Sequence, residues 1–247
     1  TRSGAVTVGI AGYTNAGKSS FFLKMSGKEV LVEDKLFSTL ETTVGRLAAS
    51  PRILLADTIG FIDNLPNATL DAFRATLSEA LECDMLMVLV DATDTLDEFQ
   101  RKISATQREI NSRYLGEEDV GILDERKIMC VLTKIEGISE TELMEKQSIV
   151  REHGYGQPLG ISVHEDIGLS ELQEAMLTQL FGSPTTLQLI HSEAGRGIEG
   201  YLSDVYNSGM IIDKKLQDNG NMIVEVWINK QSLARLVSSS DGRIEVK

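Results

Sequence analysis

The stretch GYTNAGKS, from Gly12 to Ser19, limits the possible folds of this chain more than any other part of its sequence. It matches the pattern G-x-x-x-x-G-K-[ST], follows a strand-like run and precedes a helical pattern. Glycines allow backbone N–H groups to face phosphates, and the start of a helix adds positive potential. We therefore expect a triphosphate site in which Lys18 reaches the β- and γ-phosphates and the Ser19 hydroxyl binds Mg²⁺. The alternative is a simple glycine turn between a strand and a helix.

Short apolar runs alternate with helical patterns along most of the chain. The runs cover Ala5 to Ala11, Arg52 to Ala56, Met85 to Val90 and Lys127 to Leu132. The helical patterns cover Ala68 to Leu81 and segments that open at Thr95 and Ser139, each followed by a glutamate three residues later, as in a capping box. This alternation predicts an α/β domain with a doubly wound parallel sheet, which we expect over residues 1–182.

After Pro184 the pattern changes to that of a small α+β C-terminal domain, expected over residues 184–247. Strand-like runs cover Thr186 to Ile190, Met210 to Leu216 and Met222 to Ile228, and helical stretches cover Gly197 to Tyr206 and Ser232 to Val237. The sequence DNGN, from Asp218 to Asn221, has the composition of a hairpin turn between the last two strands.

Charge and hydropathy exclude several functional classes. The formal net charge of −13 argues against a broad nucleic-acid-binding face. The longest apolar run, Met85 to Val90, is too short to span a bilayer. No secretory leader opens the chain, so we expect a cytoplasmic protein whose thiols, Cys83 and Cys130, stay reduced. The start at Thr1, directly before a strand-like run, suggests an excerpt of a longer polypeptide.

Two further stretches have the chemistry of a Mg²⁺-nucleotide site. DTIG, from Asp57 to Gly60, ends a strand-like run, so that the Asp57 carboxylate can hold Mg²⁺ and the Gly60 N–H can meet a γ-phosphate. FSTLETT, from Phe37 to Thr43, lies in a region that we expect to be strandless. A switch loop needs one threonine as a second Mg²⁺ ligand, and spacing alone does not choose among the three candidates, Thr39, Thr42 and Thr43.

The tetrad Thr133-Lys134-Ile135-Glu136 ends a strand-like run where many nucleotide-binding proteins carry Asn-Lys-x-Asp, whose Asp recognises guanine. It could read guanine, read another base, or be an ordinary strand end. A loop from Ser162 to His164 follows a short strand and could direct a backbone N–H at a base carbonyl. An ordinary turn before a helix is the alternative for that loop.

Taken in order, these motifs resemble the HflX family of translational GTPases, in the Obg-like branch of P-loop proteins. The family pattern runs GYTNAGKST, FATLDPTTR, DTVGFI, LP and AFRATLEE. The corresponding stretches of this chain are GYTNAGKSS, FSTLETTVGR, DTIGFIDNLP and DAFRATLSEA. The match runs from Val8 to about Leu180, and the following small domain resembles the C-terminal domain of the family. The family's N-terminal ribosome-contacting domain would lie before Thr1.

The resemblance implies a Mg²⁺-dependent GTPase that binds the large ribosomal subunit and splits ribosomes under stress. It places Thr39 on Mg²⁺ with Ser19 and Asp57, and it makes Lys18, Thr39 and Gly60 the catalytic groups. It also implies that Asn15 helps to hold K⁺ beside the phosphates; the alternative is that Asn15 only hydrogen-bonds within the loop. The implied nucleotide-binding residues are Gly12, Tyr13, Thr14, Asn15, Ala16, Gly17, Lys18, Ser19, Phe37, Ser38, Thr39, Leu40, Glu41, Asp57, Thr58, Ile59, Gly60, Thr133, Lys134, Ile135, Glu136, Ser162, Val163 and His164.

The sequence departs from the family pattern in the base-reading tetrad, which is Thr-Lys-x-Glu, and in the missing proline of FATLDPTTR. A third feature is shared with the family: Phe61 stands where many other GTPases carry a water-orienting Gln, so we expect slow intrinsic hydrolysis. Two alternatives follow. The chain could be a purine-tolerant NTPase that also takes ATP, or a nucleotide-gated binding module with negligible hydrolysis.

Overall fold

The computed structural model describes residues 6–27, 43–48, 53–57, 83–114, 128–192 and 196–247. By its internal contacts the chain divides into two compact units, and the division in its second half falls between Glu174 and Ala175. This point lies inside helix α5 (Leu169–Phe181), a few residues before the predicted domain boundary at 182–184. The exact boundary therefore stays a prediction.

The first unit is built on a six-stranded sheet with the order β2-β3-β1-β4-β5-β6. The strands are β1 (Val6–Gly12), β2 (Thr43–Ala48), β3 (Ile53–Asp57), β4 (Met85–Asp91), β5 (Ile128–Thr133) and β6 (Leu159–Gly160). β1, β4, β5 and β6 pair in parallel, with Gly12 opposite Leu89 and Asp91 opposite Thr133. Because β4 and β5 are buried along their whole length, they consist almost entirely of apolar residues.

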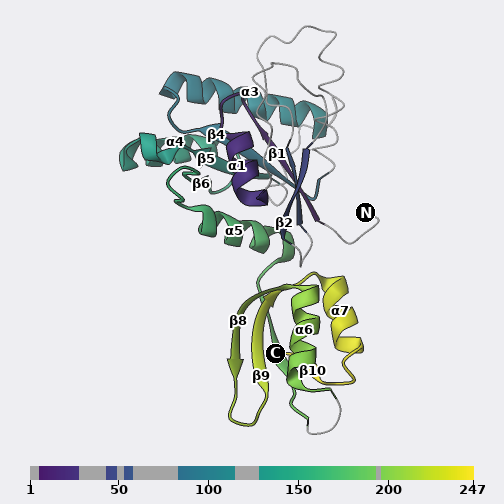
Figure 1. The fold of residues 1–247 in the computed structure, drawn as a ribbon. Helices are drawn as coiled ribbons and strands as arrows, with labels where there is room; N and C mark the ends of the chain where they lie inside the picture. Colours follow the sequence, from purple (N-terminus) through teal and green to yellow (C-terminus); the bar gives the residue numbers. More distant parts are fainter. Residues whose placement is uncertain (1–5, 28–42, 49–52, 58–82, 115–127, 193–195) are drawn as a thin grey trace. The chain divides into compact units, whose positions relative to one another are not determined.

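Helices cover this sheet, as Figure 1 shows, with α3 and α4 on one side and α1 on the other. The helices are α1 (Lys18–Ser26), α3 (Leu96–Tyr114), the 3₁₀ turn η1 (Ile135–Gly137), α4 (Glu140–Glu152) and α5. Phe99 and Ile103 of α3 and Val150 of α4 pack on β4 and β5 in one buried core. This arrangement confirms the predicted α/β fold. Among the described helices, none is long and apolar enough to cross a membrane.

The two predicted capping signals lie at helix starts. At α4, the Ser139 hydroxyl accepts from the Glu142 N–H while the Glu142 carboxylate accepts from Ser139, which completes the capping box. At α3, the Glu98 N–H donates to Thr95 Oγ1 at 3.4 Å, but the Glu98 carboxylate accepts two hydrogen bonds from Arg101. The second signal therefore marks the start of the helix correctly, but its Glu98 carboxylate pairs with Arg101 and does not complete a capping box.

The structure corrects the expectation that the region after Phe37 is strandless, because β2 begins at Thr43. Its sequence, TVGRLA, contains a glycine and an arginine, and glycine is depleted in strands, so its apolar signal is weak. The short strand β10 (Ile244–Val246) was also not predicted. The helix predicted at residues 68–81 lies outside the described residues.

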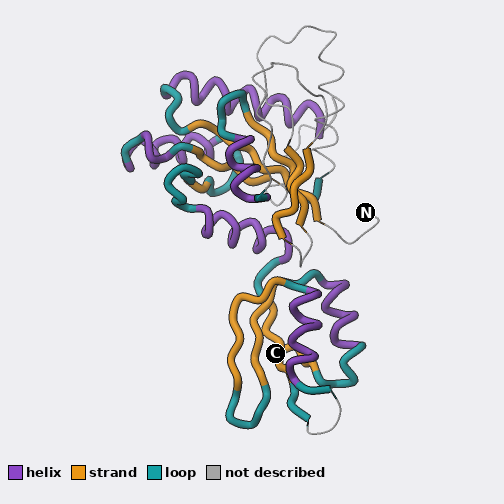
Figure 2. The backbone as a smooth tube through the Cα atoms, viewed as in Figure 1, coloured by secondary structure: helices purple, strands orange, loops and turns teal. Residues whose placement is uncertain are grey.

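The second unit has an antiparallel sheet with the order β10-β7-β9-β8, and Figure 2 shows two helices against one of its faces. The elements are β7 (Thr185–Leu189), α6 (Ile198–Ser208), β8 (Met210–Leu216), β9 (Met222–Trp227), α7 (Lys230–Ser238) and β10. Leu187, Val224 and Val205 meet in its buried core. The predicted hairpin turn lies between β8 and β9, where Gly220 has a φ of 80° and Asn221 N–H donates to Asn219 Oδ1.

We expect Leu187→Ala to lower the free energy of unfolding of the second unit by about 2–5 kcal/mol, because it opens a cavity at a fully buried side chain. Leu216→Ala is the matched control: Leu216 belongs to the same sheet but is 64% exposed, so its loss should cost about 0.5 kcal/mol or less. Urea unfolding followed by the fluorescence of Trp227, the only tryptophan, reports on this unit. Equal effects of the two variants would contradict the placement of Leu187 in the core.

Candidate functional site

The loop from Gly12 to Ser19 turns sharply between β1 and α1. Gly12 has a φ of 154°, and a Cβ atom added there would lie 2.3 Å from the Leu89 carbonyl oxygen of the neighbouring strand. Gly17 has a φ of 83° and caps the start of α1. Asn15 also has a left-handed backbone, with a φ of 65°, a conformation that residues other than glycine seldom adopt. The backbone therefore requires glycine at both ends of the loop.

Lys18 begins α1, and its side chain folds back over the loop. Its Nζ donates to the carbonyl oxygens of Gly12, at 3.1 Å, and Tyr13, at 2.9 Å. Ser19 is the next residue of the same helical turn and is half-buried. The ammonium and the hydroxyl thus lie at the helix N-terminus, where the partial positive charge of the backbone N–H groups favours an anion.

The end of β5 is tied directly to this loop. Thr133 is 2% exposed, and its hydroxyl lies 2.9 Å from the Ala16 carbonyl oxygen and 3.2 Å from that of Val90. Through this contact, the tetrad that begins at Thr133 is joined to the loop between β1 and α1. The next residue, Lys134, has a left-handed backbone with a φ of 59° and turns the chain into η1.

Glu136 and the loop after β6 lie beyond this turn. Glu136 is exposed, and it makes no hydrogen bond or ion pair with the residues that the structure describes. Ile135 N–H donates to the Ile161 carbonyl at 3.3 Å, so the two loops are adjacent. Ser162 is buried, and its backbone N–H and carbonyl pair with Ile167 in a tight turn that leaves Val163 half-buried and His164 exposed.

A cleft of about 930 Å³ opens between the loop from Gly12 to Ser19, Lys134 and α3. Its lining residues are Tyr13, Thr14, Asn15, Gly17, Lys18, Ser19, Ser20, Asp91, Asp94, Glu98, Arg101, Lys102 and Lys134. A cleft of this size can hold a nucleotide-sized ligand. It brings together seven of the predicted residues. Glu136 and the Ser162 to His164 loop are not among its lining residues.

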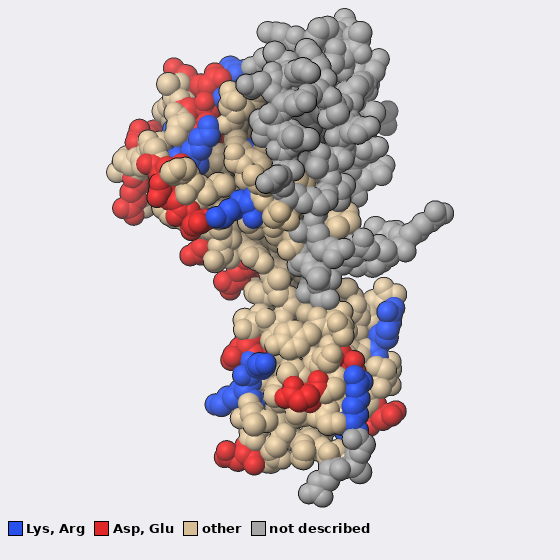
Figure 3. All heavy atoms as spheres, in the orientation of Figure 1, with Lys and Arg blue, Asp and Glu red and all other residues tan. Residues whose placement is uncertain are grey.

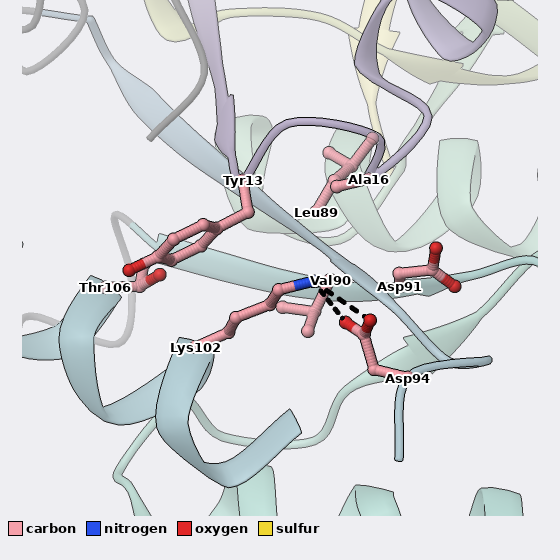
Figure 4. A pocket seen from close by; sticks show the side chains of 8 residues that line it. All are labelled: Tyr13, Ala16, Leu89, Val90, Asp91, Asp94, Lys102 and Thr106. Carbon is pink, nitrogen blue, oxygen red and sulfur yellow. Dashed lines mark hydrogen bonds and ion pairs between the residues drawn. The ribbon is translucent and has the colours of Figure 1, made fainter. Parts of the chain in front are cut away.

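The structure adds charged residues from the end of β4 and from α3 that the sequence analysis missed. Figure 4 shows Lys102 reaching from α3 toward Asp94, with both carboxylate oxygens 2.9 Å from Nζ, and the Tyr13 ring lying beside α3. The Arg101 guanidinium lies 5.7 Å from the centroid of the Tyr13 ring. A search for polar residues after each parallel strand would have found Asp91 and Asp94, because ligands bind at that edge of such sheets. Residues on a helix face carry no such signal.

Two of these carboxyl groups have shifted pKa values. Burial raises the pKa of Asp91, but hydrogen bonds from Lys134 and Thr93 outweigh it and hold the pKa below its ordinary value. The hydrogen bond from Arg101 lowers the pKa of Glu98 to about 2. Both groups are therefore ionised at neutral pH, and each balances a cation at the cleft.

Other predicted site residues lie outside the described residues. They are Phe37, Ser38, Thr39, Leu40, Glu41, Thr58, Ile59 and Gly60. For Asp57 only the backbone is described; it is the last residue of β3, next to β1 in the sheet. Because β3 ends there, Asp57 occupies the strand-end position that its motif predicts.

The family model described as a 50S ribosome-binding GTPase matches residues 7–134, just over half of the 247 residues. A GTPase HflX from Gluconacetobacter diazotrophicus is 31% identical over 98% of this chain and 50% of its own length. One from Thermofilum pendens is 36% identical over 72% of this chain and 40% of its own length. The chain belongs to the HflX family of GTPases. The resemblance predicted from the motifs is thereby confirmed.

Solved structures of GTP-binding proteins share this fold. The solved structure of a GTP-binding protein from Sulfolobus solfataricus in complex with GDP is similar, with a TM-score of 0.54 and 25% identity. The likeness covers 71% of this chain and 52% of that one. The chain spans about half the length, or less, of the curated HflX relatives named above.

Proposed function

We propose that this chain binds guanine nucleotides together with Mg²⁺ and hydrolyses GTP slowly, as the nucleotide-binding core and C-terminal domain of an HflX GTPase. One observation carries the proposal: Lys18 and Lys134 line the same cleft, and the Thr133 hydroxyl meets the Ala16 carbonyl between them. A nucleotide has phosphates at one end and a base at the other. The loop at Lys18 suits the phosphates, and the end of β5 suits the base.

In this proposal the residues Gly12 to Ser19 surround the phosphates. Backbone N–H groups at the start of α1 donate to phosphate oxygens, and Lys18 forms a charge-assisted contact with the β- and γ-phosphates. Gly12 lets the loop lie against β4 at Leu89, because a Cβ atom there would meet the Leu89 carbonyl oxygen. These contacts orient the phosphates before any chemistry takes place.

Mg²⁺ fits the donor set at this cleft. Ser19 offers a hydroxyl oxygen on the cleft wall, and Mg²⁺ in nucleotide sites takes few protein oxygens together with phosphate oxygens and water. Within the described part of the chain, no group of three or more His, Cys, Asp or Glu forms a cage. We assign Thr39 and Asp57 as the other Mg²⁺ ligands, and Gly60 as a γ-phosphate contact, from their motifs. Bound Mg²⁺ would neutralise charge that develops on the phosphate oxygens.

We assign base reading to Glu136. A carboxylate can accept from both N1–H and the exocyclic 2-amine of guanine, and Glu136 is exposed without a partner among the described residues. Adenine presents an acceptor at N1 and lacks the 2-amine, so it would leave the carboxylate unpaired. Thr133 cannot donate to the base, because its single hydroxyl proton is directed at the carbonyl oxygens of Ala16 and Val90. The loop from Ser162 to His164 would place a backbone N–H behind the base.

We propose slow intrinsic hydrolysis because Phe61 cannot orient the attacking water. A cation held at Asn15 would provide the charge that other GTPases take from an arginine finger. Asn15 lines the cleft and is exposed, and its backbone is left-handed. We therefore assign Asn15 to K⁺.

The proposed partner is the large ribosomal subunit, and the proposed location is the cytoplasm. The net charge of −13 gives this chain little general attraction for RNA phosphates. Figure 3 shows acidic side chains gathered over α4 on the visible face of the first unit. We therefore expect that any contact of this part of the protein with a ribosome is local and weak.

The main test is calorimetry with GDP, GTP and ATP on the unaltered chain and on Lys18→Ala. We expect Lys18→Ala to lose measurable triphosphate binding, because no other ammonium of the loop can replace the charge-assisted contact. Lys24→Ala is the control on the same helix; its exposed ion pair with Asp166 contributes little, so GTP affinity should stay within about threefold. Unchanged GTP affinity in Lys18→Ala would rule out the phosphate-loop assignment.

We expect single-turnover GTP hydrolysis to be faster in K⁺ than in Na⁺ at equal ionic strength, because a bound cation at Asn15 stabilises charge in the transition state. Asn15→Ala should hydrolyse GTP in K⁺ at the same slow rate as in Na⁺. Equal rates in both salts for the unaltered chain would show that Asn15 only supports the loop. Nucleotide binding without hydrolysis in either salt would favour the nucleotide-gated binding module.

We expect the unaltered chain to prefer GTP over ATP by about a hundredfold or more, because adenine leaves the Glu136 carboxylate unpaired. Glu136→Asp should tighten GDP binding, since the shorter side chain restores the family geometry. Glu136→Gln should shift the preference toward xanthosine nucleotides, whose 2-carbonyl can accept from the amide. ATP and GTP affinities within threefold of each other would show that Glu136 does not read the base, and would favour a purine-tolerant NTPase.

A further inference from the structure

We propose that Asp91 is a positioning residue for the nucleotide base, and that it acts by holding the Lys134 side chain in place. The proposal rests on the proposed function, because it concerns the base end of the same cleft. Neither the motif pattern nor the predicted site residues include Asp91. It is the last residue of β4, and its backbone pairs in register with Thr133 at the end of β5.

The Asp91 carboxylate is held from both sides. One oxygen accepts from Lys134 Nζ at 2.5 Å, and the other accepts from the Thr93 N–H at 2.9 Å and the Thr93 hydroxyl at 2.6 Å. Asp91 is 8% exposed, so water competes little for these contacts. The carboxylate can therefore fix the position of the ammonium that it binds.

The segment that carries Asp91 is itself anchored. Lys146 of α4 is buried, and its Nζ donates to the carbonyl oxygens of Ala92, at 2.5 Å, and Asp94, at 2.7 Å. The Ala92 N–H donates to the Thr133 carbonyl at 2.9 Å. These contacts join the end of β4 to α4 and to the base-reading strand, so Asp91 has a defined place without help from a ligand.

The same segment also presses against the turn that carries Glu136. A Cβ atom added at Gly137 would lie 2.8 Å from the Thr93 methyl group, which shows how closely the two loops pack. Lys134 needs the support of this packing, because a left-handed backbone is unfavourable for residues other than glycine. Both the backbone and the side chain of this turn thus depend on residues 91–93.

The charge balance explains how the pair would serve a base. Lys134 lines the cleft and its ammonium is balanced by Asp91, so its methylene stem is the part of the side chain that would lie against a base. The phosphates are left to Lys18 at the other end of the cleft. Loss of the Asp91 charge would free the Lys134 stem and weaken the contact with the base, while the phosphate contacts stay as they are.

Calorimetry with two probes, GDP and inorganic pyrophosphate, tests this inference in Asp91→Asn. We expect GDP affinity to fall about tenfold, as for a lost charge-assisted contact, and pyrophosphate affinity to stay within about twofold. The matched control is Asp84→Asn at the opposite end of β4, where the carboxylate accepts from Thr7. Both affinities of the control should match those of the unaltered chain.

Lys134→Met keeps most of the apolar stem but removes the ammonium, and it keeps the inference testable if Asp91→Asn fails to fold. It should lower GDP affinity without changing pyrophosphate affinity. If Asp91 acts through Lys134, adding Asp91→Asn to Lys134→Met should cause no further loss.

Equal GDP affinity in Asp91→Asn and the unaltered chain would overturn the inference, as would an equal loss for GDP and pyrophosphate or fully additive effects in the double variant. An unaltered chain that binds neither probe would instead overturn the proposed function, and the inference with it.

Discussion

The parallel alignment of β1, β4 and β5 is the constraint on which the rest of the site depends. It places the ends of three strands at one edge of the sheet, and each end continues into a loop that faces the cleft. The buried Thr133 hydroxyl then joins the third loop to the first through the Ala16 carbonyl. A hydrogen bond in this buried position is costly to leave unmade, so it ties the end of β5 firmly to the loop before α1.

Charge at the cleft is distributed in pairs. Lys134 is balanced by Asp91, Lys102 by Asp94 and Arg101 by Glu98. This pairing limits the general attraction of the cleft for anions and leaves recognition to directed contacts at the start of α1. In the proposed function, such pairing would also avoid unbalanced positive charge beside the neutral ring of the base.

The second unit is built differently from the first, because its sheet is antiparallel and its two helices pack against one face. Its core residues Leu187 and Val224 alternate with half-buried or exposed neighbours, and Val205 follows Leu202 at helical spacing, so its elements could be recognised in the sequence. The residues that line the cleft all belong to the first unit.

The sequence by itself determined the phosphate-loop pattern, the alternation of strands and helices, and the family. These features are local: glycine at positions of positive φ, a lysine at a helix start and apolar runs of strand length can be recognised within a few residues. It did not reveal β2, whose glycine and arginine hide its apolar pattern, or the three-residue β10. Only the tertiary structure brought Asp91 to Lys134 and Tyr13 to Arg101, because these contacts join residues that are far apart in the chain. Strand register and helix packing decide such contacts, and neither leaves a mark in the sequence around the residues that meet.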